Sequence, residues 1–189
     1  MDERSYVREL ARQVAALAAS DEYEARRRRW RDVNALRRPD RPPVYCRPVG
    51  CWPEILPDEA LKCQNPALRG AEAARRRHLI KDDIGDDSLI PPFRPVPAAV
   101  RQEGRHTWGV EIRRIRPDSP GGAWRYDPPI KDEADLDRLR APEFVHDEAE
   151  TARRLDAAGE LLGDILPVRV TAGLPLSPTM CTAAADLVG

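Results

Sequence analysis

The last quarter of the chain is typical of a helix, a strand, a tight turn and a second helix, and no other feature constrains the fold as much. An amphipathic helix that stops at Gly163 leads into the apolar run Ile165–Thr171, which predicts a buried strand. Ala172–Pro175 supplies a tight turn, and Ser177 with Pro178 supplies a helix cap followed by a proline at the first helical position. This order of elements predicts a parallel α/β layer.

Three segments are expected to be parallel strands, near Val44, near Leu89 and near Val168. A closed barrel of such units needs eight strands over about 250 residues, and the chain has 189 residues. We therefore predict an α/β fold class, the N-terminal part of a (β/α)8 TIM-type barrel with N-terminal helices and an inserted β-hairpin. Residues 1–40 are expected to form the helical segment, and residues 41–189 the first, incomplete part of the barrel.

Local signals place the remaining elements. Apolar spacing predicts a helix over about Glu3–Ala19, Ser20 caps a second helix, and Asn65 caps a third over about Pro66–Ile80. The inserted hairpin is expected from alternation over Thr107–Arg116, a turn at residues 120–122 and a returning strand at residues 123–127. Further helix starts are expected at residues 132 and 147.

Composition excludes several classes of protein. No run of eighteen apolar residues occurs, so we expect no membrane span and no membrane partner. The N-terminal residues lack the basic start and apolar block of a signal peptide, and the cysteines form no CxxC pair, so a cytoplasmic protein with reduced thiols is expected. Of the 31 basic residues, 28 are arginines spread over the whole chain, so the run Arg26–Arg29 is interpreted as a solvated helix face in preference to a phosphate-binding stripe. No nucleic-acid partner is expected.

No metal site is expected within this chain. The three histidines are far apart in the sequence, and the spacings of Cys46, Cys51 and Cys63 match no common zinc framework. Buried structural thiols are the favoured interpretation of these cysteines. The sequence also lacks a GxSxG nucleophile elbow and a phosphate-binding loop.

Three places could carry chemistry. Arg47–Gly50 ends the first expected strand, and an Arg there offers a fork of donors to a substrate carboxylate, although pairing with a neighbouring helix fits equally well. In the run Asp82–Asp87, mutual repulsion would raise at least one pKa if the carboxylates were held away from water; a solvated acidic turn or a helix cap is the simpler interpretation. The turn Thr171–Ser177 could present backbone amides to an anion, or simply cap a helix.

At these three places the sequence resembles the uroporphyrinogen decarboxylase superfamily. Arg41–Gly50 is similar to that family's first strand with its Arg-x-x-Gly motif, and Asp87–Pro91 is similar to its Asp-Ile-Leu-Val-x-Pro stretch. Residues 121–139 resemble its glycine-led segment and following helix, and Thr171–Leu176 resembles its Gly-x-Pro-Phe-Thr-Leu turn. The resemblance runs from about Asp32 to the end of the sequence, with the motifs in the same order.

The resemblance implies a barrel enzyme that acts on a tetrapyrrole or a corrinoid-linked substrate. It places the catalytic carboxylates at Asp87 and Asp86, and the substrate-binding residues at Arg47, Gly50, Thr171 and Gly173. Cys51 stands where the family has a second Arg, which favours methyl transfer slightly over decarboxylation. Decarboxylation needs no cofactor, whereas methyl transfer would use a corrinoid protein as partner and zinc bound by residues later than Gly189.

Two further expectations concern assembly. A homodimer is among the expected partners of such an enzyme. The alternative to an enzyme is a non-catalytic truncated fragment, or a subunit that needs a partner to complete the barrel, because three parallel strands alone would leave an unpaired edge exposed.

Overall fold

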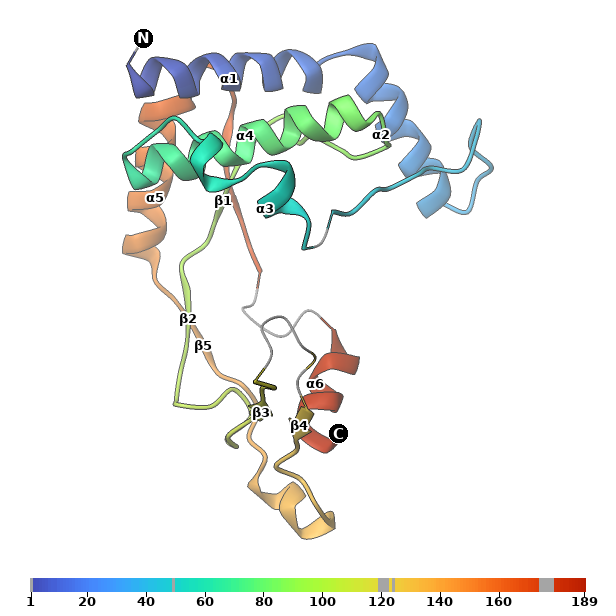
Figure 1. Ribbon diagram of the computed structural model, residues 1–189, viewed down its shortest axis with the longest axis vertical. Coiled ribbons are helices and arrows are strands. Elements are labelled where there is room, and N and C mark those ends of the chain that lie inside the picture. The colour runs from blue at the N-terminus through green and yellow to red at the C-terminus, as the bar shows by residue number, and fades with distance from the viewer. Residues whose placement is uncertain (1, 49, 119–122, 124, 174–178) are drawn as a thin grey trace. The chain divides into compact units, whose positions relative to one another are not determined.

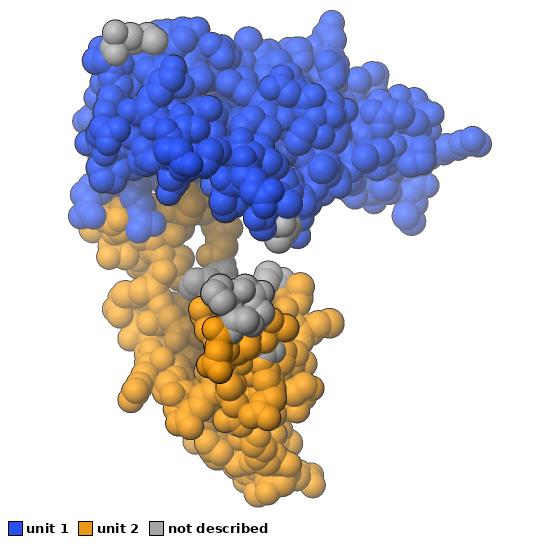
Figure 2. Space-filling model, in the orientation of Figure 1, with its two compact units in different colours: residues 1–96, 153–170 blue, residues 97–152, 171–189 orange. Residues whose placement is uncertain are grey.

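The computed structural model describes residues 2–48, 50–118, 123, 125–173 and 179–189. They belong to two compact units (Figure 2), residues 1–96 with 153–170 and residues 97–152 with 171–189. Residue 40, where the sequence suggested a boundary, lies inside the first unit. Helix exceeds strand, 49% against 11%, and the described strands form small sheets and no closed barrel. The chain is therefore a mixed α/β protein.

The first unit is built on helices α1 (Glu3–Ala18), α2 (Asp21–Asn34) and α4 (Pro66–Ile84), as Figure 1 shows. Ser20 caps α2 and Asn65 caps α4, each accepting a hydrogen bond from a backbone amide of the first turn. The short helix α3 (Trp52–Ile55) and the 3-10 turn η1 (Asp58–Ala60) connect α2 to α4. The expected starts of the second and third helices are confirmed.

Apolar side chains of α1 hold these helices together. One buried cluster joins Val14 and Ala18 of α1 to Tyr23 of α2 and to Ile90, and a second joins Val7 to Cys63 and Ala71. The clusters are separate and small. The unit therefore depends on polar contacts as well as on its apolar core.

Helix α4 runs four residues further than predicted. Asp82 lies in its last turn, where its carboxylate accepts a hydrogen bond from the hydroxyl of Tyr23 at 3.1 Å. Gly85 then ends the helix with a φ of 71°, a left-handed conformation that glycine adopts without steric cost. The first half of the acidic run is thus helix and not loop.

Two of the three predicted parallel strands are wrong. Residues 42–48 and 89–91 belong to no helix or strand in the described part of the chain. The third prediction is confirmed as β6 (Val168–Thr171), which pairs with β1 (Arg94–Pro97). The Arg94 amide donates to the Pro167 carbonyl at 2.7 Å and the Ala98 amide to the Thr171 carbonyl at 2.9 Å. The two bonds advance in the same direction along both segments, as in a parallel pair.

The second unit contains two antiparallel pairs. β2 (Val100–Gln102) pairs with β5 (Phe144–His146), and β3 (Arg113–Ile115) pairs with β4 (Arg125–Asp127). The predicted hairpin is confirmed, but its first strand begins at residue 113 because residues 103–110 form bends and turns. Its turn at residues 120–122 lies outside the described residues.

The remaining elements are helical. They are η2 (Glu133–Arg138), which is 3-10, α5 (Glu148–Leu162) and α6 (Met180–Val188). Thr179 caps α6 and accepts the Thr182 amide at 3.0 Å, whereas the predicted cap Ser177 lies outside the described residues. Among the described residues, no helix is both long and apolar enough to cross a bilayer.

Candidate functional site

A cavity of about 780 Å³ lies in the first unit. Three candidates from the sequence, Arg47, Gly50 and Asp87, line it together. The resemblance implied that these residues belong to one site, next to strands expected near Val44 and Leu89, but neither strand forms in the described part of the chain. The carboxylates of Asp86 and Asp87 bring them together instead.

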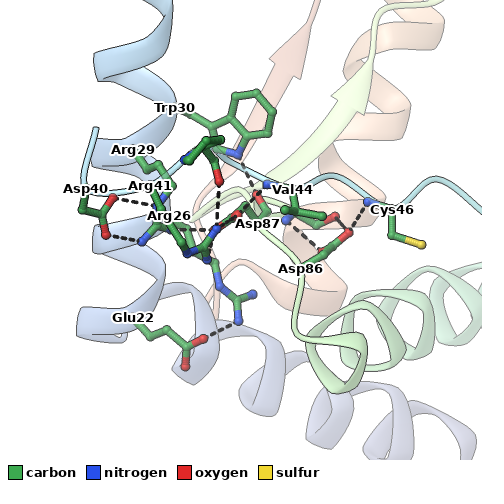
Figure 3. Close-up of polar contacts among 12 residues, drawn as sticks. Glu22, Arg26, Arg29, Trp30, Asp40, Arg41, Val44, Cys46, Asp86 and Asp87 are labelled. Carbon is green, nitrogen blue, oxygen red and sulfur yellow. Dashed lines mark hydrogen bonds and ion pairs between the residues drawn. The ribbon is translucent and has the colours of Figure 1, made fainter. Parts of the chain in front are cut away.

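The Asp87 carboxylate anchors the extended segment that leads to Arg47 (Figure 3). Arg29 donates to its Oδ1 at 2.6 Å, and Arg41 donates to Oδ2 at 2.6 Å and to Oδ1 at 3.0 Å. The Val44 amide donates to Oδ2 at 2.7 Å, and the Trp30 indole donates to the backbone carbonyl of Asp87 at 2.7 Å. With four donors on two oxygens, the lone pairs of this carboxylate are all engaged.

Asp86 holds the next part of the same segment. Its Oδ2 accepts the Cys46 amide at 2.7 Å (Figure 3). The same oxygen accepts the Ser88 hydroxyl at 3.0 Å and forms an ion pair with Lys81. Its Oδ1 accepts the Ser88 amide at 2.9 Å. Side-chain acceptors on one segment therefore satisfy backbone amides of another, as a sheet ladder would do.

Both carboxylates stay ionised. Burial alone would raise the pKa of Asp87, but the Arg41 hydrogen bond, the Val44 amide and the charges of Arg29 and Arg41 together lower that pKa. Burial alone would also raise the pKa of Asp86. The hydrogen bonds from Lys81, Ser88 and Cys46 outweigh burial, so this pKa is lowered as well. The expectation that crowding would raise a pKa in this run is wrong for both residues, because each has its own cation. The interpretation as a solvated turn is wrong too, since Asp86 and Asp87 are buried.

The wall of the cavity is basic and aromatic. The guanidinium of Arg77 lies 5.3 Å from the ring centre of Trp52, and the ammonium of Lys81 lies 5.1 Å from that of Tyr45. Asp87 is the acidic residue of the lining, and Arg29 and Arg41 already neutralise it. Within the described residues, Arg47 and Arg77 have no carboxylate partner, so the cavity carries excess positive charge.

The cysteines differ in exposure. Cys63 is buried, as predicted, whereas Cys46, Cys51 and Cys181 are exposed, so the buried interpretation is wrong for Cys46 and Cys51. Cys46 also lines the cavity. No cluster of three or more His, Cys, Asp or Glu side chains suited to a metal ion occurs in the ranges that the structure describes.

Thr171 and Gly173 belong to the second unit. Thr171 ends β6, and its carbonyl accepts the Ala98 amide. Gly173 is exposed, and the turn that follows it, residues 174–178, lies outside the described residues. Neither residue is among those that line the cavity of the first unit.

Sequence reasoning missed the buried arginines of α2, of which Arg29 binds Asp87. The run Arg26–Arg29 was interpreted as a solvated face, yet Arg26 is 4% exposed and Arg29 is 8% exposed. The available signal was spacing: Arg26, Arg29 and Trp30 follow Tyr23 at steps of three and four, which place them on the buried face of α2.

No family model, curated protein or solved structure matches this chain.

Proposed function

We propose that the cavity of the first unit binds a ring-shaped substrate that bears carboxylates, a tetrapyrrole or a corrinoid-linked compound, within a barrel enzyme that resembles the uroporphyrinogen decarboxylase superfamily. One observation carries the proposal: two arginines and an aromatic wall line the same cavity. Neither Arg47 nor Arg77 has a carboxylate partner in the described chain. A cavity of about 780 Å³ is within the size range of small-molecule sites.

The two features of the wall match the two features of such a substrate. Guanidinium groups present a planar fork that binds carboxylates at two points. Trp30, Tyr45 and Trp52 offer apolar faces on which a flat ring packs. The remaining cation, Lys81, is tied to Asp86, so we assign it to the support of the loop and not to the substrate.

In this proposal Asp87 has a structural role and does not transfer a proton. Its lone pairs are occupied by four donors, so it has no free site for a proton from substrate. Its lowered pKa keeps it ionised. Because Arg29 and Arg41 balance that charge, Asp87 serves to fix the loop that carries Arg47 and not to stabilise a cation in the cavity. Asp86 supports Asp87 by fixing Cys46 and the loop that carries Arg47.

Methyl transfer stays slightly favoured over decarboxylation, because Cys51 replaces the second Arg of the family motif. Methyl transfer implies zinc and a corrinoid partner. The described residues do not fit a zinc ion, since they contain no cluster of suitable ligands. We therefore derive no step through zinc, and the proposal depends on anion binding alone.

The alternative proposal is a non-catalytic fragment or a subunit that needs a partner, for which a second copy of the chain is one candidate. It is favoured by exposed apolar side chains, Leu36 at 96% and Val44 at 60% exposure. The paired strands β1 and β6 form a sheet of only two strands, and a pair this small is marginal on its own.

Titration with uroporphyrin, an octacarboxylate porphyrin, tests the proposal. Quenching of tryptophan fluorescence should saturate, and Arg47→Gln or Arg77→Gln should each weaken binding about tenfold or more, since a charged hydrogen bond contributes roughly 1.5–3 kcal/mol. Arg38→Gln, at an exposed position of the same unit outside the cavity lining, is the matched control. Equal binding of a cationic porphyrin of the same ring size would reject a site for carboxylates and leave the alternative proposal.

A further inference from the structure

A second, smaller cavity of the first unit contains buried positive charge. It measures about 40 Å³ and lies among α1, α4 and the segment that enters β1. Arg75 and His78 of α4 and Arg94 of β1 line it, together with apolar side chains such as Val14 and Phe93. No carboxylate occurs in this lining, within the ranges that the structure describes.

The charge of Arg75 is uncompensated within the described residues. Its side chain is 4% exposed, and its Nη1 donates to the carbonyl of Ala71 at 3.0 Å. Burial and then the neighbouring charge of Arg94 lower the pKa of Arg75 to about 10, so both residues stay protonated near neutral pH. Two like charges thus face one small cavity.

The other buried arginines of the unit provide the contrast. Arg26 is paired with Glu22, and Arg29 is paired with Asp40 and Asp87. Buried charges are retained in proteins when they are paired, because desolvation of an isolated charge is costly. A counter-charge for the buried Arg75, with the half-buried Arg94 beside it, is therefore expected from outside the described chain.

We propose that this cavity is an anion site that takes one small carboxylate, held between the guanidinium groups of Arg75 and Arg94. A planar carboxylate matches the planar guanidinium fork, and a cavity of about 40 Å³ admits such a group but not a large ligand. Burial and the charges of Arg75 and Arg94 lower the pKa of His78, so at neutral pH its uncharged ring offers one N–H donor. His78 and Ile90 also line the larger cavity, but the carboxylate site rests on Arg75 and Arg94, which line the smaller cavity and not the larger one, so it does not depend on the proposed porphyrin site.

Thermal unfolding of the full chain in sodium acetate tests the proposal. Acetate should raise the Tm saturably, by about 3–6 °C at ten times its Kd, because a ligand that binds only the folded state stabilises it. Sodium gluconate at the same ionic strength is the matched control, since it carries the same charge on a group too large for the cavity. An equal effect of gluconate would overturn the proposal, as would a response to inorganic phosphate without one to acetate.

Two variants separate binding from packing. Arg94→Gln should abolish the acetate-dependent rise without lowering the Tm in gluconate, because it removes a repulsive charge. Arg94→Lys should keep a weaker response, since the charge stays while the fork is lost. Arg38→Gln should respond as the unchanged chain does.

The ¹³C-acetate resonance gives a readout that is independent of stability. It should broaden in the presence of the unchanged chain but not of Arg94→Gln; equal broadening by both would overturn the assignment.

Discussion

Val44 and Asp87 are joined by reciprocal hydrogen bonds: the Val44 amide donates to the Asp87 carboxylate at 2.7 Å, and the Asp87 amide donates to the Val44 carbonyl at 2.8 Å. In a sheet, both bonds would join backbone groups; here one acceptor is the Asp87 side chain. The two segments are therefore joined at this residue pair without forming strands. Because Arg29 and Arg41 bind the same carboxylate, the fixed loop and the second helix share one charged junction.

Asp87→Asn should destabilise the first unit by about 3–5 kcal/mol, the usual cost of removing one partner of a buried ion pair. Arg29, 8% exposed, would keep only Asp40 as a partner. The resemblance implied a catalytic role for Asp87, whereas its contacts in the structure predict a loss of stability. Urea unfolding measures it, and Asp83→Asn, four residues earlier and exposed, should change stability by less than about 0.5 kcal/mol. Equal midpoints for the two variants would contradict a structural role for Asp87.

Acid should remove the stabilisation that the carboxylates of Asp40, Asp86 and Asp87 give to the first unit, within a defined pH range. Arg29 and other contacts lower the pKa of Asp40 to about 2, and the pKa values of Asp86 and Asp87 are also lowered. Because carboxyls with a lowered folded pKa take up protons more readily when unfolded, their contribution is complete above about pH 5, and it is lost as the pH falls from about 4 through the lowered folded values, about 2 for Asp40. Urea midpoints at pH 7, 5, 4 and 3 measure this loss. A main loss of stability between pH 7 and 5 would point to a different group.

Tyr23→Phe should cost about 1–3 kcal/mol, because it removes a hydrogen bond to a charged group while the buried ring stays. Burial first, and then the charge and hydrogen bond of Asp82, raise the pKa of Tyr23 to about 12. A raised folded pKa means that the stabilisation is present below pH 10 and is lost as the pH rises from 10 toward 12. A pH titration followed by absorbance at 295 nm measures tyrosine ionisation. The step at the highest pH should be missing from Tyr23→Phe; if it is still present, it belongs to another tyrosine.

Local signals predicted the helices, and long-range pairing determined the site. Ser20 before α2 and Asn65 with Pro66 before α4 are short patterns whose physics is complete within a few residues, so these helix starts were predictable. The bonds from Arg29 and Arg41 to Asp87 join residues 58 and 46 positions apart. No spacing rule connects such residues, and the apolar run at Val44 therefore looked like a strand, although carboxylates and not a neighbouring strand satisfy its amides.

The thiols offer the most direct test of how the cavity is built. Burial, and next the hydrogen bond to Glu72, raise the pKa of Cys63 to about 11, so this thiol should resist iodoacetamide at pH 8 until the chain unfolds. Cys46 is exposed at the cavity wall and should react readily, as should the exposed Cys181 of the second unit. Mass spectrometry of the digested protein separates these sites. Bound uroporphyrin should slow the modification of Cys46, and Arg77→Gln should weaken that protection; an unchanged rate at Cys46 in saturating uroporphyrin would mean that the ligand does not occupy the cavity beside Arg47.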